Sequence, residues 1–302
     1  MNDAAIAISG LVQRRANFEL GPIELVIPRG YVTAVVGPNG SGKSSLFRLL
    51  LDLAKPDKGR IELLGERVGS GEDTALKARI GYVPEQSIDI EDGLRGSQKA
   101  DFVRQWYPNW DVNLYQELLR RFEVDPALKL GKMSKGMRRK FDLALAIAHQ
   151  PELLLLDEPS SGLDPIAWKM MIEVLHRYMD RNGRTIVMAS HIIDEVKRLA
   201  DYIVFVVQGK VLGMYEKDAL LDGWQALYVD SGGGAAMDWT RMPGFLSATV
   251  SRGTTYKVVT ADAPEAERWL AAEEANVRLI SKQKLELDEI LLFHIEQARG
   301  VL

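Results

Sequence analysis

The chain has 302 residues, of which 46% are hydrophobic and 26% charged, an ordinary globular composition that argues against disorder and against a single small domain. Its 42 acidic and 38 basic residues leave a net charge of −4, so binding to nucleic acid is not expected. The absence of cysteine excludes a disulfide framework, a thiolate metal site and a cysteine nucleophile.

The longest apolar runs, at residues 153–156 and 202–207, are far shorter than the roughly 18 residues that a membrane-spanning helix needs. Each has the length of a strand buried in a sheet. The first nine residues lack a basic segment followed by a long apolar one, so we expect no secretory signal and a cytoplasmic location. Any association with a membrane is therefore expected to depend on a partner protein.

Strand and helix patterns alternate near the start of the chain. Residues 23–27 alternate in polarity, and residues 31–36 form an apolar, largely β-branched run that stops at Gly37, as a strand buried on both faces does. Residues 43–53 carry leucines at helical spacing and end before Pro56, which predicts a helix.

The middle of the chain is helical in pattern before strands resume. Helices are expected near 103–106, at 114–122 and at 137–149. Strands are then expected at 153–156, 185–189, 202–207 and 211–215, with helices at 165–182 and 192–199. This alternation indicates a doubly wound parallel sheet that carries a helical insertion.

Beyond about residue 220 the sequence changes in character. A glycine run at 231–234 lacks the Lys-Ser/Thr of a phosphate loop and is interpreted as a flexible linker. Twelve acidic and eight basic residues lie from Leu221 onward, so this segment accounts for the whole net charge. A small α+β appendage is expected, with strands at 248–250, 256–259 and 278–281 and helices at 264–274 and 288–298.

A P-loop, G-x-x-x-x-G-K-[ST], lies between the predicted strand and helix, which is the context that this motif requires. It consists of Gly37, Pro38, Asn39, Gly40, Ser41, Gly42, Lys43 and Ser44, and Ser45 follows. Glycines let successive N–H groups point at phosphate oxygens, with the positive end of a helix behind them. Lys43 is expected to reach the β- and γ-phosphates of a nucleotide, and Ser44 to bind Mg²⁺, with Ser45 in support.

Two carboxylates follow the apolar run at 153–156, at the end of a strand where open α/β sheets bind their ligands. Asp157 is expected to hold Mg²⁺, directly or through water. Glu158 is expected to polarise the water that attacks the γ-phosphate. The alternative interpretation is a solvated Asp-Glu pair without a catalytic role. The presence of a P-loop in the same chain argues against this alternative.

With these motifs the chain resembles, over about residues 5–215, the nucleotide-binding subunits of ATP-binding cassette (ABC) transporters. The position of that family's signature, usually Leu-Ser-Gly-Gly-Gln, is occupied by Met133, Ser134, Lys135, Gly136 and Met137. The resemblance implies that Ser134, Lys135, Gly136 and Met137 act in trans, binding ATP held on the P-loop of a second subunit in a head-to-tail dimer. Lys135 and Met137 depart from the usual signature in a form similar to the ABC-2 type, whose relatives often serve export or efflux.

Two further family motifs occur in the expected order. The D-loop is matched by Ser161, Gly162, Leu163 and Asp164. His191 follows the predicted strand at 185–189 and matches the family's switch histidine, which contacts the γ-phosphate. The other histidines, His149, His176 and His294, are expected to be structural or solvated.

The chain departs from the family at two places. Where the Q-loop glutamine is expected, Glu85 stands first and Gln86 follows, so either side chain could contact Mg²⁺ or water. The position of the adenine-stacking aromatic is occupied by Arg15, with Phe18 three residues on, and both are kept as candidates for stacking on the base.

Two other clusters have alternative interpretations. The basic residues Lys135, Arg138, Arg139 and Lys140 are expected to form a solvated helix face or to help balance phosphate charge. The aromatic stretch at 106–110 either packs in the core or lies exposed against a permease, since the family uses its helical subdomain and Q-loop to hold a coupling helix.

The resemblance implies an α/β P-loop NTPase of the ABC type, with a parallel-core sheet, an antiparallel β subdomain and a helical subdomain at about 87–150. The ATP-binding domain is expected at 1–220 and a small α+β accessory domain at 221–302. The implied activity is ATP hydrolysis with Mg²⁺ that drives a separate membrane permease from the inner face of the cell membrane, and the implied direction is export. The expected partners are a second copy or a homologous ATPase subunit, and the permease.

Two alternatives stay open at this point. One is a soluble ABC-type ATPase that acts on ribosomes or nucleic acid without a permease. The other is a nucleotide-gated binding module without turnover, against which Glu158 argues.

Overall fold

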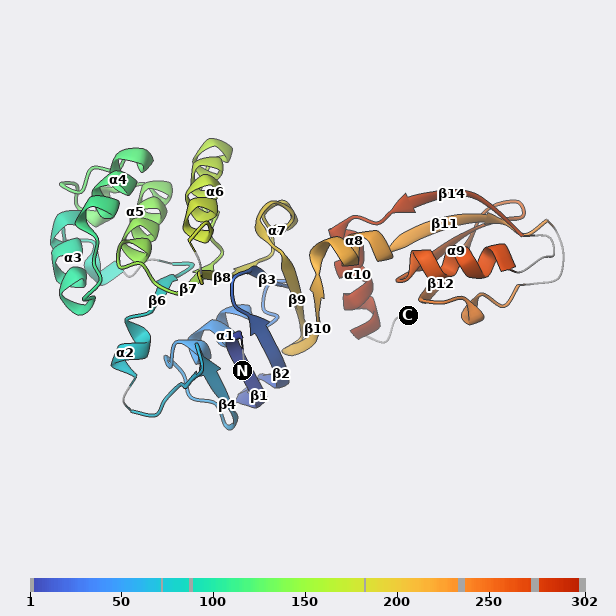
Figure 1. Cartoon of the computed structure of the whole chain (residues 1–302), viewed down its shortest axis with the longest axis horizontal. Helices are drawn as coiled ribbons and strands as arrows, with labels where there is room; N and C mark the ends of the chain where they lie inside the picture. The colour runs from blue at the N-terminus through green and yellow to red at the C-terminus, as the bar shows by residue number, and fades with distance from the viewer. Residues whose placement is uncertain are drawn as a thin grey trace. The chain divides into compact units, whose positions relative to one another are not determined.

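The computed structural model describes residues 3–71, 73–86, 89–181, 183–232, 237–272 and 277–298. The chain divides into two compact units, Met1–Met214 and Tyr215–Leu302, whose elements are labelled in Figure 1. The division falls six residues before the boundary predicted from composition.

A six-stranded sheet forms the centre of the first unit. Its order is β10-β9-β3-β8-β7-β6, and the pairs β3/β8, β3/β9, β7/β8 and β6/β7 are parallel. The strands are β3 (Val32–Val36), β6 (Ile80–Val83), β7 (Leu153–Asp157), β8 (Thr185–Ser190), β9 (Tyr202–Val207) and β10 (Lys210–Glu216). Every residue of β3, β7 and β8 is buried, which explains why these strands are apolar or β-branched up to Asp157 and Ser190, the polar residues that end β7 and β8.

An antiparallel sheet of order β2-β1-β4-β5 accompanies it. Its strands are β1 (Ala4–Arg15), β2 (Phe18–Pro28), β4 (Lys58–Leu63) and β5 (Glu66–Arg67). One cluster of buried residues joins this sheet, the helix at Lys43–Leu50 and the parallel sheet. Its members include Ile8, Phe47 and Leu155. The predicted combination of a parallel-core sheet with an antiparallel sheet is confirmed.

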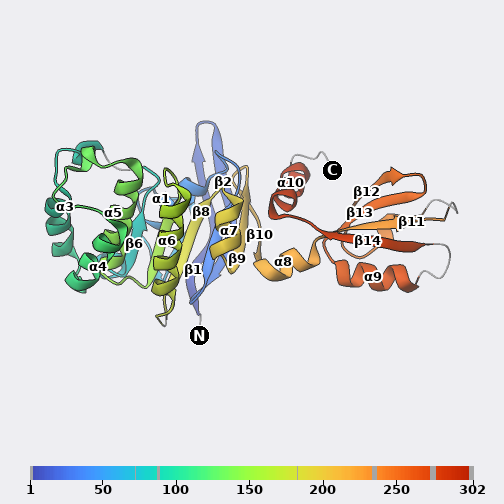
Figure 2. The ribbon, with the colours of Figure 1, turned by 90° about the horizontal axis from the view of Figure 1, so that it is seen from above.

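Helices connect the strands of the first unit. They are α1 (Lys43–Leu50), α2 (Thr74–Lys77), α3 (Gly96–Val103), α4 (Val112–Phe122), α5 (Lys135–Ala148), α6 (Pro165–Met179) and α7 (Ile193–Leu199), with 3-10 turns at Asp89–Glu91, Arg104–Trp106 and Leu130–Lys132. In Figures 1 and 2, α3, α4 and α5 gather beside the β6 edge of the sheet. This group is the helical insertion that the change of period indicated.

The second unit is an α+β fold with its own core. Its sheet has the order β12-β13-β11-β14 with antiparallel neighbours. The elements are α8 (Lys217–Gly223), β11 (Gln225–Asp230), a 3-10 turn at Trp239–Arg241, β12 (Phe245–Arg252), β13 (Thr255–Thr260), α9 (Ala263–Ala272), β14 (Arg278–Lys284) and α10 (Leu287–Ala298). Leu227, Val258 and Leu270 are central to the core. Of the glycines read as a linker, Gly233 and Gly234 lie outside the described residues.

Among the helices of the described residues, none combines the length and the apolar character needed to cross a membrane.

Candidate nucleotide-binding site

The P-loop connects β3 to α1, and two of its glycines have no room for a side chain. A Cβ on Gly37 would lie 2.0 Å from the carbonyl oxygen of Val206. Gly42, which precedes α1, has φ +111°, and a Cβ there would lie 2.8 Å from Cδ1 of Leu20. The loop can therefore curl tightly over the start of the helix only because these positions are glycine.

Polar groups in the loop fit an anionic ligand. Lys43 is 6% exposed, and its ammonium group donates to the carbonyl oxygens of Gly37 at 2.8 Å and Pro38 at 3.3 Å. The hydroxyl of Ser41 is buried and has no hydrogen-bond partner among the described residues. A buried cation beside an unsatisfied hydroxyl is costly without a ligand, so this loop matches the chemistry of a bound phosphate chain. Pro38, Asn39 and Gly40 form the more exposed tip of the loop, and Ser45 is half-buried behind it.

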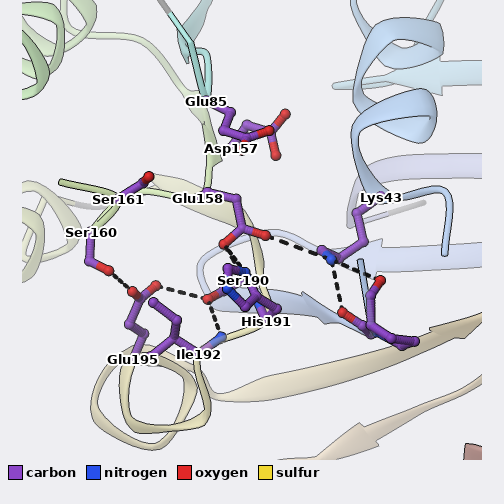
Figure 3. Close-up of polar contacts among 12 residues, drawn as sticks. Lys43, Glu85, Asp157, Glu158, Ser160, Ser161, Ser190, His191, Ile192 and Glu195 are labelled. Carbon is purple, nitrogen blue, oxygen red and sulfur yellow. Dashed lines mark hydrogen bonds and ion pairs between the residues drawn. The ribbon is translucent and has the colours of Figure 1, made fainter. Parts of the chain in front are cut away.

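Glu158 lies between Lys43 and His191 at the carboxyl end of β7 (Figure 3). Its Oε1 is 3.6 Å from Nζ of Lys43, and its Oε2 is 2.7 Å from Nδ1 of His191. The Glu158 carboxylate is buried, whereas nearly half of the His191 side chain is exposed. The structure thus brings together the three side chains that the motifs assign to the γ-phosphate, the attacking water and the switch.

The oxygen atoms expected to hold Mg²⁺ also meet here. The hydroxyl of Ser44 donates to Oδ1 of Asp157 at 3.4 Å. Burial raises the pKa of Asp157 to about 6, and the nearby Glu85 and Glu158 carboxylates contribute to the rise. Figure 3 shows Glu85 beside Asp157. A hydroxyl and crowded carboxylates form an oxygen-only donor set that fits a hard divalent cation.

Of the two Q-loop candidates, Glu85 lies near Asp157 (Figure 3). The negative charge of Glu85 helps to raise the pKa of Asp157. The backbone carbonyl oxygen of Glu85 accepts a hydrogen bond from Arg139 at 2.9 Å. Glu85 and Gln86 are both exposed, and both line a hollow beside Lys135 and Arg139.

The signature stands at the start of α5, and its first residues are already engaged within the chain. Ser134 caps the helix by accepting a hydrogen bond from the N–H group of Met137 at 3.1 Å. Lys135 donates to the hydroxyl of Ser161 in the D-loop at 2.9 Å. Gly136 also faces the D-loop, because a Cβ there would lie 3.1 Å from the carbonyl oxygen of Gly162. Signature and D-loop are therefore neighbours in one subunit.

The D-loop leads into α6. Gly162 has φ +81°, and the Lys135 side chain would clash with a Cβ at this position. Leu163 is half-buried. Asp164 caps α6 and accepts hydrogen bonds from the N–H groups of Ile166 and Ala167 at 2.9 and 2.8 Å, which satisfies backbone donors at the helix start.

The basic cluster differs from its prediction at two positions. Arg138 and Arg139 are each only 5% exposed, so the expectation of a solvated face is wrong for them. Arg138 pairs with Glu91 and Asp142. Arg139 donates to the backbone carbonyl oxygens of Pro84, Glu85 and Glu158. Because α5 is packed on nearly all sides, these guanidinium groups bind within the protein, and Arg139 links the signature helix to the Q-loop and to the end of β7.

One buried group was not found from the sequence. Glu195 on α7 is 1% exposed and accepts hydrogen bonds from the hydroxyls of Ser160 and Ser190, which adjoin the D-loop and His191. The available signal was an acidic residue on the apolar face of a short helix, one turn after the switch histidine.

The two candidates for base stacking lie together at the turn between β1 and β2, where Arg15 pairs with Phe18. The Phe18 ring borders the P-loop, because a Cβ on Gly42 would lie 3.0 Å from its Cζ. Arg15 is exposed. Of the two side chains, Phe18 is therefore the one in contact with the P-loop at the start of α1.

The aromatic stretch is divided between the two predicted environments. Trp106 is 66% exposed, whereas Tyr107 is partly buried and stacks on His149 with ring centroids 3.9 Å apart. Burial lowers the pKa of His149 to about 4, so its role is in packing. His294 is buried in the second unit and His176 is exposed.

Comparison with known proteins supports one family. A family model described as ABC transporter matches residues 20–161. The chain is 30% identical over 303 aligned positions to the Nod factor export ATP-binding protein I of Rhizobium sp. (strain N33), with 97% of each chain covered. It is 34% identical over 226 residues to the daunorubicin resistance ATP-binding protein DrrA3 of Streptomyces coeruleorubidus, covering 73% of this chain and 71% of that protein.

Two solved structures show the same fold for the first unit. An ATP-binding subunit of an ABC transporter superposes with a TM-score of 0.65 and 24% identity, covering 72% of this chain and 92% of the other. The cbiO1 protein of Clostridium perfringens, described as part of the ABC transporter complex cbiONQ, superposes with a TM-score of 0.59 and 25% identity, covering 71% and 89%.

Proposed function

The chain belongs to the ABC transporter family as one of its ATP-binding proteins, and from this premise we propose that it hydrolyses ATP to drive a separate membrane permease. The observation that carries the proposal is the placement of Glu158 between Lys43 and His191 at the carboxyl end of the parallel sheet. Phosphoryl transfer to water needs chiefly positioning and charge neutralisation, and these three side chains supply both.

Each of these groups has a part in hydrolysis. The N–H groups of the P-loop and the ammonium group of Lys43 bind the phosphate oxygens of ATP. Glu158 accepts a proton from the attacking water, and His191, already in contact with Glu158, lies exposed where it can meet the γ-phosphate. Mg²⁺ supplies neutralisation of phosphate charge when bound, and Ser44, Asp157 and Glu85 are the residues that would hold it.

We place the active form in a head-to-tail dimer with a second copy or a homologous subunit. The first reason is chemical: Ser134, Gly136 and the start of α5 offer an anion site of their own, with Lys135 adding a positive charge. The second is the contact between Lys135 and Ser161. This contact joins the signature, which would bind the partner's ATP, to the D-loop beside Glu158. It would therefore couple the ATP site of one subunit to that of the other.

The surface best suited to the permease is a groove in the first unit. It has a volume of about 370 Å³ and a mainly apolar lining that includes Leu50, Leu53, Leu76, Val103, Tyr107 and Leu145. Leu53, which lines the groove, is more than half exposed, and so are Phe102 and Trp106, which precede the lining residues Val103 and Tyr107 in the chain. An apolar groove with exposed aromatics fits an amphipathic helix of a membrane partner, which would hold this protein at the inner face of the membrane.

Transport in the export direction is favoured by the relatives. The protein matched over nearly its whole length is named for Nod factor export, and others are named for drug resistance. These names favour a transporter subunit over the alternative of an ATPase that acts on ribosomes or nucleic acid. The full-length match also includes the second unit, which we infer to be an accessory domain of the same machine.

The proposal is tested by Glu158→Gln in the full chain. The amide keeps the shape of the side chain but cannot accept the proton, so steady-state hydrolysis should fall by a factor of about 100 or more. ATP should then accumulate in a dimer that elutes earlier on a sizing column. Glu117→Gln, at an exposed carboxylate of α4, is the matched control and should keep parental turnover.

Full hydrolysis by the Glu158→Gln variant would refute the assignment of the base. A parental chain that binds ATP without turnover, even with its permease, would favour the nucleotide-gated binding module instead.

A further inference from the structure

A ring of polar contacts connects the two segments that carry Glu158 and His191, and it passes through a side chain with no assigned role (Figure 3). Glu195 accepts a hydrogen bond from the Ser160 hydroxyl on one carboxylate oxygen. Its other oxygen accepts from the Ser190 hydroxyl at 2.9 Å. The Ser190 hydroxyl in turn accepts from the N–H group of Ile192 at 3.0 Å.

The two serines that bind Glu195 lie close in sequence to Glu158 and His191. Ser160 stands two residues after Glu158 and immediately before the D-loop residue Ser161. Ser190 ends β8 and immediately precedes His191. Glu158 and His191 touch each other at 2.7 Å. The ring therefore closes from Glu158 to His191, through Ser190 and Glu195, and back through Ser160.

Burial makes the ring energetically demanding. Glu195 is 1% exposed and Ser190 is fully buried. A buried carboxylate is stable only when donors satisfy it, and a buried hydroxyl that loses its acceptor destabilises the fold. The Ser160 and Ser190 segments are thus held at a fixed separation as long as Glu195 accepts from both.

We propose that Glu195 is a positioning residue for ATP hydrolysis, which sets the distance between Glu158 and His191 by holding Ser160 and Ser190. The inference rests on the proposed ATPase function. Glu195 does not touch the reacting atoms, so its removal is expected to lower kcat and to leave the KM for ATP nearly unchanged.

The charge state of Glu195 matters for this role, because only the carboxylate accepts from both hydroxyls at once. Burial raises the pKa of Glu195 to about 7. Among neighbouring elements, Glu158 raises it further, whereas the hydrogen bond from Ser190 and the charges of His191 and Arg139 lower it. On α7 itself, Asp194 is exposed and pairs with Arg198. The two-acceptor form is therefore favoured above neutral pH and lost below it.

The test compares Glu195→Ala and Glu195→Gln in the full chain. Alanine removes both contacts, and kcat should fall by about 100-fold, as expected for misplacement of catalytic groups. Glutamine keeps two contacts by accepting through Oε1 and donating through Nε2, so kcat should fall by less than about tenfold. Asp194→Asn, one residue away on the exposed face, is the matched control and should match the parent.

A pH profile separates positioning from simple loss of stability. The ratio of parental kcat to that of Glu195→Gln should rise between pH 6 and pH 8, because glutamine cannot ionise. A ratio that does not change with pH would overturn the proposal.

A double-mutant cycle completes the experiment. Ser160→Ala and Ser190→Ala should each lower kcat in the parent and have no further effect in the Glu195→Ala background. Additive losses, or parental kcat in folded Glu195→Ala, would overturn the role of Glu195. Since every comparison is made to parental turnover, either result concerns Glu195 alone, whereas the Glu158→Gln experiment tests the ATPase itself.

Discussion

At the scale of single residues, the site is built from charged groups that are almost entirely buried. Lys43, Asp157, Glu158, Arg139 and Glu195 are each exposed by 6% or less. Glu158 in addition adopts φ 49°, a left-handed conformation that is uncommon for a residue with a side chain. Desolvated charges and backbone strain of this kind cluster at functional sites. The stability they cost should be measurable.

Glu195 gives one such measurement. Its pKa is about 7 in the folded chain against the ordinary 4.5, so the folded state holds its proton more tightly than the unfolded state. Stability from this group is therefore present below pH 4.5 and is lost as the pH rises to about 7, by about 3 kcal/mol in total.

Urea unfolding of the parent and of Glu195→Gln between pH 4 and pH 8 checks this. The difference in free energy of unfolding should shift by about 3 kcal/mol in favour of the glutamine variant over that range. A constant difference would show that the Glu195 carboxyl has the same proton affinity in both states.

Residues of the contiguous motifs were predictable because each motif is read along a single stretch of chain. The P-loop, the Asp157-Glu158 pair and His191 meet in space as expected for the ends of adjacent parallel strands. Arg139 and Glu195 were not predictable in this way. Arg139 reaches Glu158, 19 residues away, and Glu195 reaches Ser160, 35 residues away, and no local pattern indicates which face of a helix meets which loop.

At the scale of elements, the ends of strands and helices position the site. β3, β7 and β8 end side by side, because they are adjacent parallel strands. Their carboxyl ends bring the P-loop, Glu158 and His191 to one edge. Two residues of α5 and its cap help to position the site. Arg139 donates hydrogen bonds to the backbone at the ends of β6 and β7, and Ser134 caps the start of the helix.

Ser134 therefore has two separable roles, as a helix cap and as a candidate phosphate ligand for a second subunit. Ser134→Ala should cost about 1 kcal/mol of stability through loss of the cap and should also weaken the ATP-dependent dimer. Ser134→Thr keeps a hydroxyl that can cap, so its stability should approach that of the parent.

Denaturant titration and sizing chromatography of the Glu158→Gln background distinguish the two roles. A Ser134→Ala variant that loses stability but dimerises with ATP as the parent does would remove Ser134 from the proposed interface. Asp111→Ala, which removes the cap of α4 outside the nucleotide site, is the control for a general effect of capping.

At the scale of the whole molecule, the chain contains two units with separate cores. The first core joins both sheets around α1, and the second includes Leu227, Val258 and Leu270. Every candidate nucleotide contact lies in Met1–Met214. Two hydrophobic cores connected by one strand are expected to unfold separately.

Calorimetry of the full chain should accordingly show two unfolding transitions. ATP with Mg²⁺ should raise the Tm of only one of them. At a nucleotide concentration 100 times the Kd, that unit gains about 2.7 kcal/mol, or about 5–10 °C in Tm for a unit of this size. A fragment of residues 1–214 should show the ATP-sensitive transition alone. One transition that moves as a whole would mean that the two units unfold together.

The sequence by itself determined the family, the parallel-core fold, the helical insertion and the residues of the phosphate loop. These follow from short contiguous patterns whose chemistry depends on backbone geometry and on the period of apolar residues. It also indicated an α+β second unit, although β11 and α8 were not found. Tertiary structure alone decided that Glu85 lies near Asp157, that Arg138 and Arg139 are buried, and that Glu195 joins Ser160 to Ser190. The physical reason is that burial and hydrogen-bond partners depend on packing between segments far apart in the chain, which local patterns do not contain.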